Sequence, residues 1–211
     1  MYKLFLFDMD GVLLQHKSSW EYCQRAIGCD LEHFYDEFGQ DVLNGKDLTM
    51  LVLQKMMKHG FTQIKLQELA RNAPQMKGIE EVLTAINAHR GSAVIISGGI
   101  GAFAQELLNQ YPFTEYVCNE LHFNGHDLPP TCEIKVGHDD KGKVARTIID
   151  TLGVSKEETV AIGDYCNDCP MFAEAGLSIA FNGDQDAKVV ATHSIDSDDL
   201  ADILPIIFGQ K

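Results

Sequence analysis

Short apolar runs and amphipathic stretches alternate along most of this chain. Residues 78–91 and 142–153 repeat apolar side chains at helical spacing and end at glycine. Alternating strands and helices predict a parallel sheet covered on both faces, a Rossmann-like α/β core. Four runs have the mainly apolar composition of buried parallel strands: 3–7, 92–97, 159–163 and 177–181.

Two segments interrupt this alternation. Residues 15–76 hold no apolar strand run, so we expect an all-helical cap there, inserted into a core of residues 1–14 and 77–211. Residues 116–136 alternate in polarity around an Asn124-Gly125 pair, which favours a short antiparallel β flap. The cap segment shows helical spacing in four successive pieces: 19–28, 30–39, 47–60 and 64–73.

Composition and charge limit the partners of this protein. The 211 residues are 45% hydrophobic, which is ordinary for a globular protein, and they carry a formal net charge of −14. That excess of acids disfavours binding to nucleic acid or to anionic lipid. The N-terminal apolar run is short, and no run approaches the about 20 apolar residues of a membrane helix. We therefore expect a cytoplasmic protein whose six cysteines are mostly free thiols.

Polar and acidic residues follow three of the four predicted strands. Ligands of parallel sheets bind beyond the carboxyl ends of the strands, so we expect these residues to share one site. Carboxylate and amide oxygens are ligands of hard cations, and a hydroxyl beside an open backbone N–H binds anions. Lys141 and Lys143 offer a positive charge just before a helix. The strand-end residues are Asp8 and Asp10, then Ser97 and Gly98, then Asp164, Asn167 and Asp168.

These pieces resemble the motifs of the haloacid dehalogenase superfamily of phosphohydrolases. The stretch "DMDGV" looks like its D-x-D-G-[TV] motif, and "GDYCND" looks like its G-D-x-x-N-D motif. Ser97 and Lys141 look like its phosphate-binding hydroxyl and its lysine. Within the superfamily, "AIGDYCNDCPMFAEAGLSIAFN" is most similar to the phosphoserine phosphatase branch, whose small cap the helical insert matches in position and size.

The resemblance implies Mg²⁺-dependent hydrolysis of a small phosphomonoester through an aspartyl phosphate. Asp8 would be the nucleophile, and Asp10 would be the general acid and then the general base. The cap would exclude macromolecular substrates, so the partner would be a small phosphorylated metabolite. The implied metal ligands are Asp8, the Asp10 carbonyl and Asp164, supported by Asp168; the implied phosphate-binding groups are Ser97, the Gly98 N–H, Lys141 and Asn167.

The resemblance also raises doubt about phosphoserine as the substrate. Phosphoserine phosphatases bind the amino group with a glutamate nine residues after the nucleophile, and the carboxylate with a cap arginine. This sequence has Lys17 at the first position and, with the cap aligned on residues 44–46, Gln54 at the second. We therefore expect free phosphoserine not to be the best substrate. Three side chains stay open as alternatives for these two roles: Glu21, Arg25 and Arg71.

Other interpretations account for smaller parts of the sequence. Cys166 and Cys169 form a C-x-x-C pair, which also occurs in redox dithiols and zinc sites. An aspartyl-phosphate receiver domain would be a non-catalytic alternative, although such domains are about half this length and lack a helical insert. A zinc site in the flap would use four residues: Cys118, His122, His126 and Cys132.

The segment "GGIGAFA" supports a dinucleotide-binding oxidoreductase as a further alternative. Gly99, Gly101 and Ala104 satisfy a G-x-G-x-x-A pattern between a predicted strand and a helix. Glu120 lies where such a site has its ribose-binding acid. This interpretation leaves Asp8, Lys141 and the other strand-end acids without a role.

Overall fold

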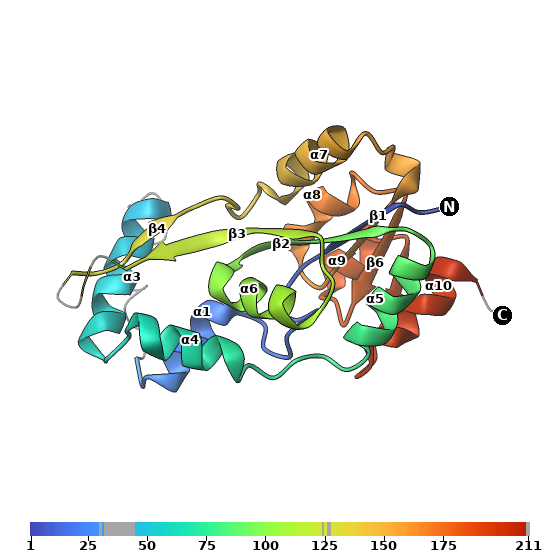
Figure 1. Cartoon of the computed structure of the whole chain (residues 1–211). Helices are drawn as coiled ribbons and strands as arrows, with labels where there is room; N and C mark the ends of the chain where they lie inside the picture. The colour runs from blue at the N-terminus through green and yellow to red at the C-terminus, as the bar shows by residue number, and fades with distance from the viewer. Residues whose placement is uncertain (30, 32–44, 124, 126–127, 210–211) are drawn as a thin grey trace.

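A computed structural model of the chain describes residues 1–29, 31, 45–123, 125 and 128–209 (Figure 1). These residues form a seven-stranded sheet in the order β4-β3-β2-β1-β5-β6-β7. All neighbours are parallel except β3 and β4, which are antiparallel. The strands are β1 (Leu4–Phe7), β2 (Ser92–Ile100), β3 (Glu115–His122), β4 (Thr131–Glu133), β5 (Thr159–Gly163), β6 (Leu177–Phe181) and β7 (His193–Ile195).

Helices cover both faces of this sheet, so the predicted Rossmann-like α/β core is confirmed. The two faces of β1 enter different clusters of buried side chains, because successive strand residues point to opposite sides. Phe5 and Phe7 pack with α5 and α6, whereas Leu4 and Leu6 pack with α7 and α8. The core helices are α5 (Ile79–Ala88), α6 (Gly101–Gln110), α7 (Lys141–Leu152), α8 (Cys169–Phe172), α9 (Gln185–Val190) and α10 (Leu204–Phe208).

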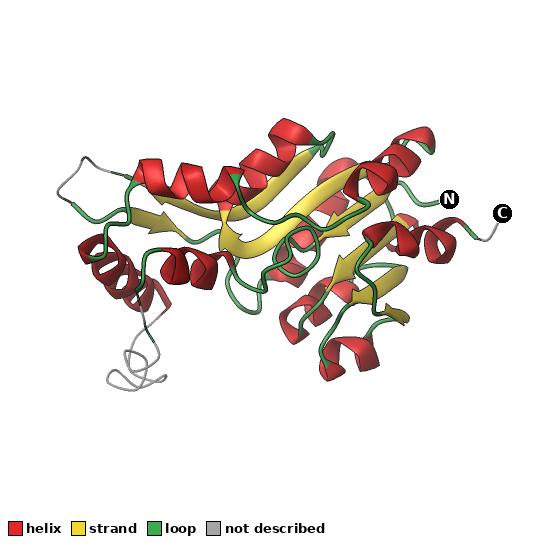
Figure 2. Ribbon diagram, turned by 90° about the horizontal axis from the view of Figure 1, so that it is seen from below, coloured by secondary structure: helices red, strands yellow, loops and turns green. Residues whose placement is uncertain are grey.

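Between β1 and α5 the described residues form helices and no strand, as the sequence predicts. Ser18 and Thr62 cap the first and last of these helices by accepting hydrogen bonds from backbone N–H groups. Figures 1 and 2 place α3 beside the β3–β4 end of the sheet, where the two elements are in contact. The cap helices are α1 (Ser19–Ala26), α3 (Gly45–Lys58) and α4 (Gln63–Arg71); the helix expected over 30–39 lies outside the described residues apart from Leu31.

The chain enters and leaves the cap segment through neighbouring backbone. Leu14 forms a bridge with Gln75, and the Gln15 N–H donates to the Pro74 carbonyl over 2.9 Å. The two crossings are therefore adjacent at the edge of the core. The division into a core of 1–14 and 77–211 and a cap of 15–76 stays a prediction.

The flap predicted over 116–136 is continuous with the main sheet. The first half of β3 pairs in parallel with β2, from Val94 opposite Glu115 onward. Its last residues pair antiparallel with β4, with Leu121 opposite Cys132. The antiparallel pairing is thus as predicted. However, β3 begins within the core, where Cys118 is buried. Asn124 of the expected turn lies outside the described residues.

Candidate active site

The site begins where the strand order reverses between β1 and β5. Asp8 directly follows β1, and its N–H donates to the Ile162 carbonyl of β5 over 2.9 Å. Asp164 directly follows β5. The carboxyl ends of parallel strands meet at one edge, and such a reversal opens a crevice there. The sheet itself therefore brings these two carboxylates together.

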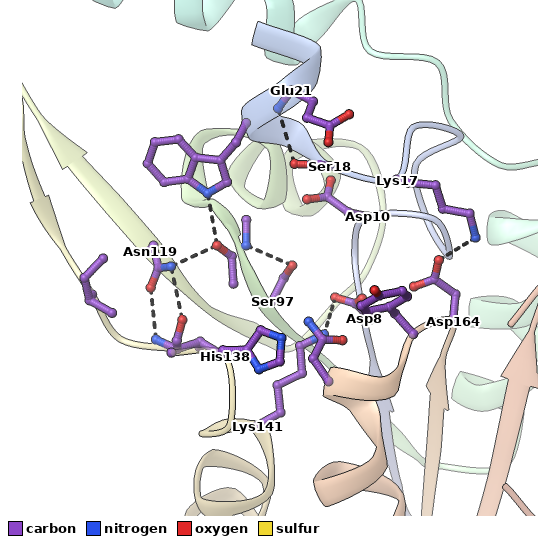
Figure 3. Close-up of a pocket in the computed structure, with 18 of the residues that line it drawn as sticks. Asp8, Asp10, Lys17, Ser18, Glu21, Ser97, Asn119, His138, Lys141 and Asp164 are labelled. Atoms are coloured by element: carbon purple, nitrogen blue, oxygen red, sulfur yellow. Dashed lines mark hydrogen bonds and ion pairs between the residues drawn. The ribbon is translucent and has the colours of Figure 1, made fainter. Parts of the chain in front are cut away.

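A cavity of about 1240 Å³ opens at this edge of the sheet (Figure 3). Cap residues such as Trp20 and Thr49 line one part of it, and flap residues such as Glu133 line another. The cavity is therefore shared by the strand ends, the cap segment and the β3–β4 flap. Most of the residues predicted for the site line it: Asp8, Asp10, Lys17, Ser97, Gly98, Lys141, Asp164 and Asn167.

A buried lysine connects two of the acids. Lys141 begins α7, and its Nζ lies 2.8 Å from Asp8 Oδ1 and 2.5 Å from Asp168 Oδ1. Asp168 is fully buried, and its Oδ2 accepts hydrogen bonds from the N–H groups of Asp164 and Tyr165 at 2.9 and 3.1 Å. Asp168 therefore fixes both the loop after β5 and the Lys141 side chain. It does so from behind the residues that line the cavity.

Burial and mutual repulsion set the charges of this group. Burial, followed by repulsion from Asp168, raises the pKa of Asp8 to about 8 against the opposing effect of Lys141. Burial opposes the charge of Lys141, but the carboxylates of Asp8 and Asp168 outweigh it and raise the pKa of the ammonium. Lys141 therefore keeps its proton, but its single positive charge does not balance the negative charge of the surrounding carboxylates.

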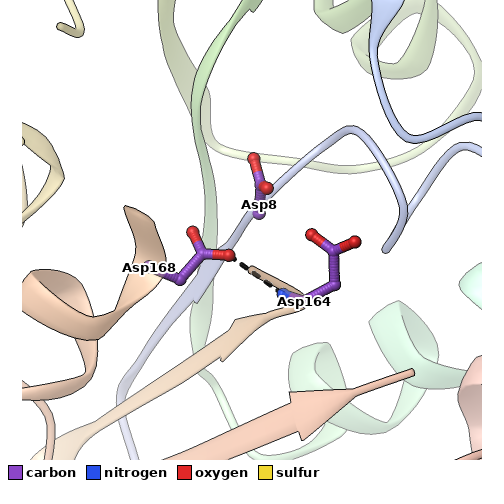
Figure 4. A group of neighbouring side chains, drawn as sticks. All are labelled: Asp8, Asp164 and Asp168. Atoms are coloured by element: carbon purple, nitrogen blue, oxygen red, sulfur yellow. Dashed lines mark hydrogen bonds between the residues drawn. The ribbon is translucent and has the colours of Figure 1, made fainter. Parts of the chain in front are cut away.

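The acids fit a hard divalent cation. Oxygens of Asp8, Asp164 and Asp168 lie within 4.8 Å of one another, and all three side chains are buried (Figure 4). Burial also raises the pKa of Asp164 to about 6, although Lys17 opposes the shift. A set of carboxylate oxygens with excess negative charge suits Mg²⁺. Asp10 is not part of this cluster among the described residues; its carboxyl oxygens lie beside Ser19 and His16.

The end of β2 has the form of an anion-binding loop. The pairing of β2 with β3 shifts register between Ser97 and Ile100, so Gly98 and Gly99 form an irregular bulge. The buried Ser97 hydroxyl accepts the Gly99 N–H over 3.1 Å. Strand β2 is therefore longer than the predicted run, which ended at Ser97, because Ile100 resumes the pairing with Asn119 after the bulge.

Two residues that the sequence did not single out hold this loop. The Trp20 indole donates to the Gly98 carbonyl over 3.1 Å, and the Asn119 amide donates to the same oxygen over 2.9 Å. Asn119 also receives the N–H groups of Lys135 and Val136. These partners are distant in sequence, so no local pattern could identify them.

Lys17 and Gln54, the two residues expected to decide substrate choice, lie in different surroundings. Lys17 lines the cavity, and its Nζ lies 2.5 Å from Asp164 Oδ2 and 3.2 Å from the Asn182 carbonyl. Gln54 is exposed on α3 and does not belong to the described residues that line the cavity, although Thr49 of the same helix does. Asn44, on which the cap was aligned, lies outside the described residues.

The glycines of "GGIGAFA" serve packing contacts within the chain. A Cβ at Gly99 would lie 2.6 Å from both Asp10 Oδ2 and Ser19 Oγ. A Cβ at Gly101 would lie 2.7 Å from the Glu120 carboxylate. The space beside these glycines, which a dinucleotide would need, is therefore filled by side chains of this chain. A dinucleotide site is not favoured.

The cysteine patterns do not form a second centre among the described residues. Cys166 and Cys169 are half-buried, and burial raises the pKa of the Cys169 thiol, which disfavours a reactive thiolate. The flap residues Cys118 and Cys132 are buried, and neither joins a metal-binding cluster there. His126 lies outside the described part of the chain.

Comparisons with known proteins agree with this geometry. Residues 2–176 match the family model described as haloacid dehalogenase-like hydrolase. The phosphoserine phosphatase of Methanocaldococcus jannaschii is 26% identical over 208 residues, covering 97% of each chain. That of Archaeoglobus fulgidus is 26% identical over 220 residues, which are 97% of this chain and 60% of that protein.

Solved structures extend the similarity to the whole fold. A phospho-aspartyl intermediate analogue of phosphoserine phosphatase has a TM-score of 0.79 and 25% identity, covering 97% of this chain and 98% of the other. Both comparisons therefore lead to the branch whose motifs the strand ends resemble. In the described part of the chain, no helix is long and apolar enough to cross a membrane.

Proposed function

We propose that this chain, which belongs to the haloacid dehalogenase-like hydrolase family, hydrolyses small phosphomonoesters through an aspartyl phosphate at Asp8. One observation carries the proposal: the Asp8 carboxylate, at the end of the central strand, pairs with the buried Lys141 in the cavity wall and clusters with Asp164 and with Asp168 behind it. That arrangement supplies a nucleophile, a cation-binding set and a phosphate-binding charge at one point.

The first half of the reaction is a displacement at phosphorus. Asp8 Oδ1 already accepts the Met9 N–H over 2.7 Å and contacts Lys141, so we assign the attack to Oδ2. A bond forms between Oδ2 and phosphorus, the bond from phosphorus to the alcohol oxygen breaks, and Asp10 donates a proton to that oxygen. The product is an aspartyl phosphate and a free alcohol.

The second half restores the enzyme. Asp10, now a carboxylate, accepts a proton from water as the water attacks phosphorus. The bond between phosphorus and Asp8 breaks, inorganic phosphate leaves, and Asp8 is again a carboxylate. One residue thus serves both steps, because each needs a proton transfer on the same side of the phosphoryl group.

Fixed donors stabilise the charge on the phosphoryl oxygens. Lys141, the Ser97 hydroxyl and the Gly98 N–H are the groups that we assign to this role, with the Asn167 amide beside them. A divalent cation held by Asp8, Asp164 and the Asp10 carbonyl, with Asp168 in support, would offset the repulsion between carboxylate and phosphate. The oxygen-only donor set favours Mg²⁺ for this position.

The rest of the cavity argues against an amino-acid leaving group. Beyond the phosphate-binding residues it is lined by groups such as Trp20, Glu21 and Glu133. Glu21 there offers an acid to an ammonium group, but no arginine occurs among the described residues that line the cavity. A carboxylate on the substrate would lack the bidentate partner that arginine provides. We therefore propose a small phosphomonoester other than free phosphoserine, despite the names of the relatives.

A screen of small phosphorylated metabolites tests the proposal. Turnover is measured with Mg²⁺ and again after chelation, for wild type and for Asp8→Asn. We expect the substitution to lower turnover at least about a thousandfold, the scale seen when a central nucleophile is removed. Asp150→Asn, the same change at an exposed position of α7, is the matched control and should leave turnover unchanged. Wild-type activity in Asp8→Asn would exclude the covalent route.

A further inference from the structure

We propose that His16 and Ser19 are positioning residues that hold the Asp10 carboxyl from its two oxygens. The inference rests on the proposed function, in which Asp10 delivers the proton to the leaving alcohol. Neither His16 nor Ser19 belongs to the residues that line the cavity among those described, so both would act through Asp10. The two residues come from the loop after β1 and from the start of α1.

Ser19 holds one oxygen of this carboxyl with two donors. Its N–H and its hydroxyl lie 2.9 and 2.8 Å from Asp10 Oδ2. The same hydroxyl accepts the Ile100 N–H over 3.0 Å, which ties it to the end of β2. Ser19 is fully buried, so water does not compete for these bonds. Oδ2 is therefore fixed to the cap helix and to the sheet together.

His16 lies at the other oxygen. Its Nε2 is 3.2 Å from Asp10 Oδ1, and both side chains are nearly buried. Neither of these atoms has a hydrogen-bond partner among the described residues. An unpaired buried acceptor is costly, so the facing ring nitrogen is the group that can satisfy Oδ1. We assign a proton to Nε2, which then donates to Oδ1.

The imidazole ring is itself held in place. It stacks on the Tyr22 ring with centroids 4.5 Å apart and a 15° angle between the planes. The Phe103 ring meets it edge-on at 5.6 Å. The His16 carbonyl accepts the Gly11 N–H over 2.8 Å, which fixes the backbone of the loop. Contacts from α1 and α6 therefore set the direction of Nε2, as a positioning role requires.

Orientation matters because general acid catalysis contributes about 10²–10⁴-fold only when the acid lies within hydrogen-bonding reach of its target. A carboxyl held at one oxygen alone can turn about its side-chain bonds. With both oxygens held, it keeps one direction through both half-reactions. In the first half-reaction, the loss from removing one contact should therefore appear only where the leaving group needs a proton, whereas the water attack of the second half-reaction is common to all esters.

This dependence on the leaving group gives the test. His16→Phe keeps the ring between Tyr22 and Phe103 and removes both nitrogens. Turnover is compared for 4-nitrophenyl phosphate, whose leaving group departs without a proton, and for the most reactive alkyl phosphomonoester of the screen. Because kcat/KM reports the first half-reaction alone, we expect kcat/KM for the alkyl ester to fall at least about tenfold and kcat/KM for the aryl ester to fall less than about threefold.

Three further variants separate positioning from packing. His16→Gln restores a side-chain N–H near the position of Nε2 and should recover part of the alkyl turnover. Ser19→Ala removes one donor to Oδ2 and should show the same selective loss. Phe103→Leu loosens the ring that holds the imidazole, so it should show a smaller loss with the same selectivity for the alkyl ester.

The outcomes are distinguishable from failure of the proposed function. If wild type hydrolyses neither ester, or if Asp8→Asn hydrolyses both as well as wild type, the proposed function itself is wrong. If Asp8 is essential but His16→Phe and Ser19→Ala slow both esters equally, or slow neither, the positioning role is wrong. His16→Gln behaving as His16→Phe would likewise remove the assignment to Nε2.

Discussion

The Lys141 ammonium is the residue on which the charge balance of the site depends. It is buried and contacts Asp8 and Asp168 directly. The repulsion between the two carboxylates is offset there by a single proton-bearing group. Removing one partner of a buried ion pair leaves an uncompensated charge, which costs about 3–5 kcal/mol. The same ammonium is available to a phosphoryl group at the cavity surface, so stability and catalysis depend on one atom.

Lys141→Met therefore should lower both quantities. We expect turnover to fall at least about a hundredfold, as when an electrostatic donor is lost, and the free energy of unfolding to fall by about 3 kcal/mol. Denaturant unfolding and steady-state kinetics measure the two effects. Lys143→Met is the matched control, because Lys143 is exposed and pairs only with Asp140 at 2.8 Å in the described contacts. A stable and active Lys141→Met protein would contradict this role.

The paired cysteines beside the acidic loop have no part in this chemistry. Replacing both Cys166 and Cys169 by serine should leave Mg²⁺-dependent turnover within about tenfold, because neither thiol is needed to move a proton or to hold phosphate. Metal analysis of the purified protein accompanies the kinetics. Stoichiometric zinc that disappears in the double variant together with activity would show that the C-x-x-C interpretation was the correct one.

The elements that carry the nucleophile and the acids were largely predictable, and those that support them were not. Apolar runs predicted β1, β2, β5 and β6, because parallel strands buried on both faces leave a continuous pattern. Strand β7 is three mostly exposed residues and leaves none. The contacts of the cap helix with the core are also invisible in the sequence, since Ser19 and Ile100 are 81 residues apart. Asp8 and Lys141 were found because strand ends and motif spacing locate them.

In the proposed function, the cap and the loop before it would decide which phosphate ester is accepted. Free phosphoserine should not be the best substrate, because Lys17 would repel its ammonium and the exposed Gln54 offers its carboxylate no charge. The measurement compares kcat/KM for phosphoserine with that for other small phosphomonoesters, including some that carry a remote anionic group. A hundredfold preference for phosphoserine, about 2.7 kcal/mol of transition-state binding, would show that the cap binds the amino acid in another way.

At the scale of the whole molecule, the net negative charge opposes the binding of a phosphate ester. A protein with a net charge of −14 has to bind a phosphate dianion at a cluster of carboxylates. Long-range repulsion opposes that approach, so the attraction must come from local charges. In the proposed function, Lys141 would supply one positive charge, and a divalent cation held at the cluster of Asp8, Asp164 and Asp168 would supply the rest. A cation bound at these acids would therefore turn a cluster that repels phosphate into a site that attracts it.

Trapping the covalent intermediate tests the central claim most directly. Asp10→Asn is mixed with 4-nitrophenyl phosphate and Mg²⁺ and quenched in acid. The first step needs no proton from Asp10 with this leaving group, whereas the second step needs a base, so the intermediate should accumulate. Peptide mass spectrometry should find one phosphoryl group on Asp8, removable by hydroxylamine and absent from Asp8→Asn. A phosphoryl group on any other residue, or steady nitrophenol release by Asp8→Asn, would contradict the account.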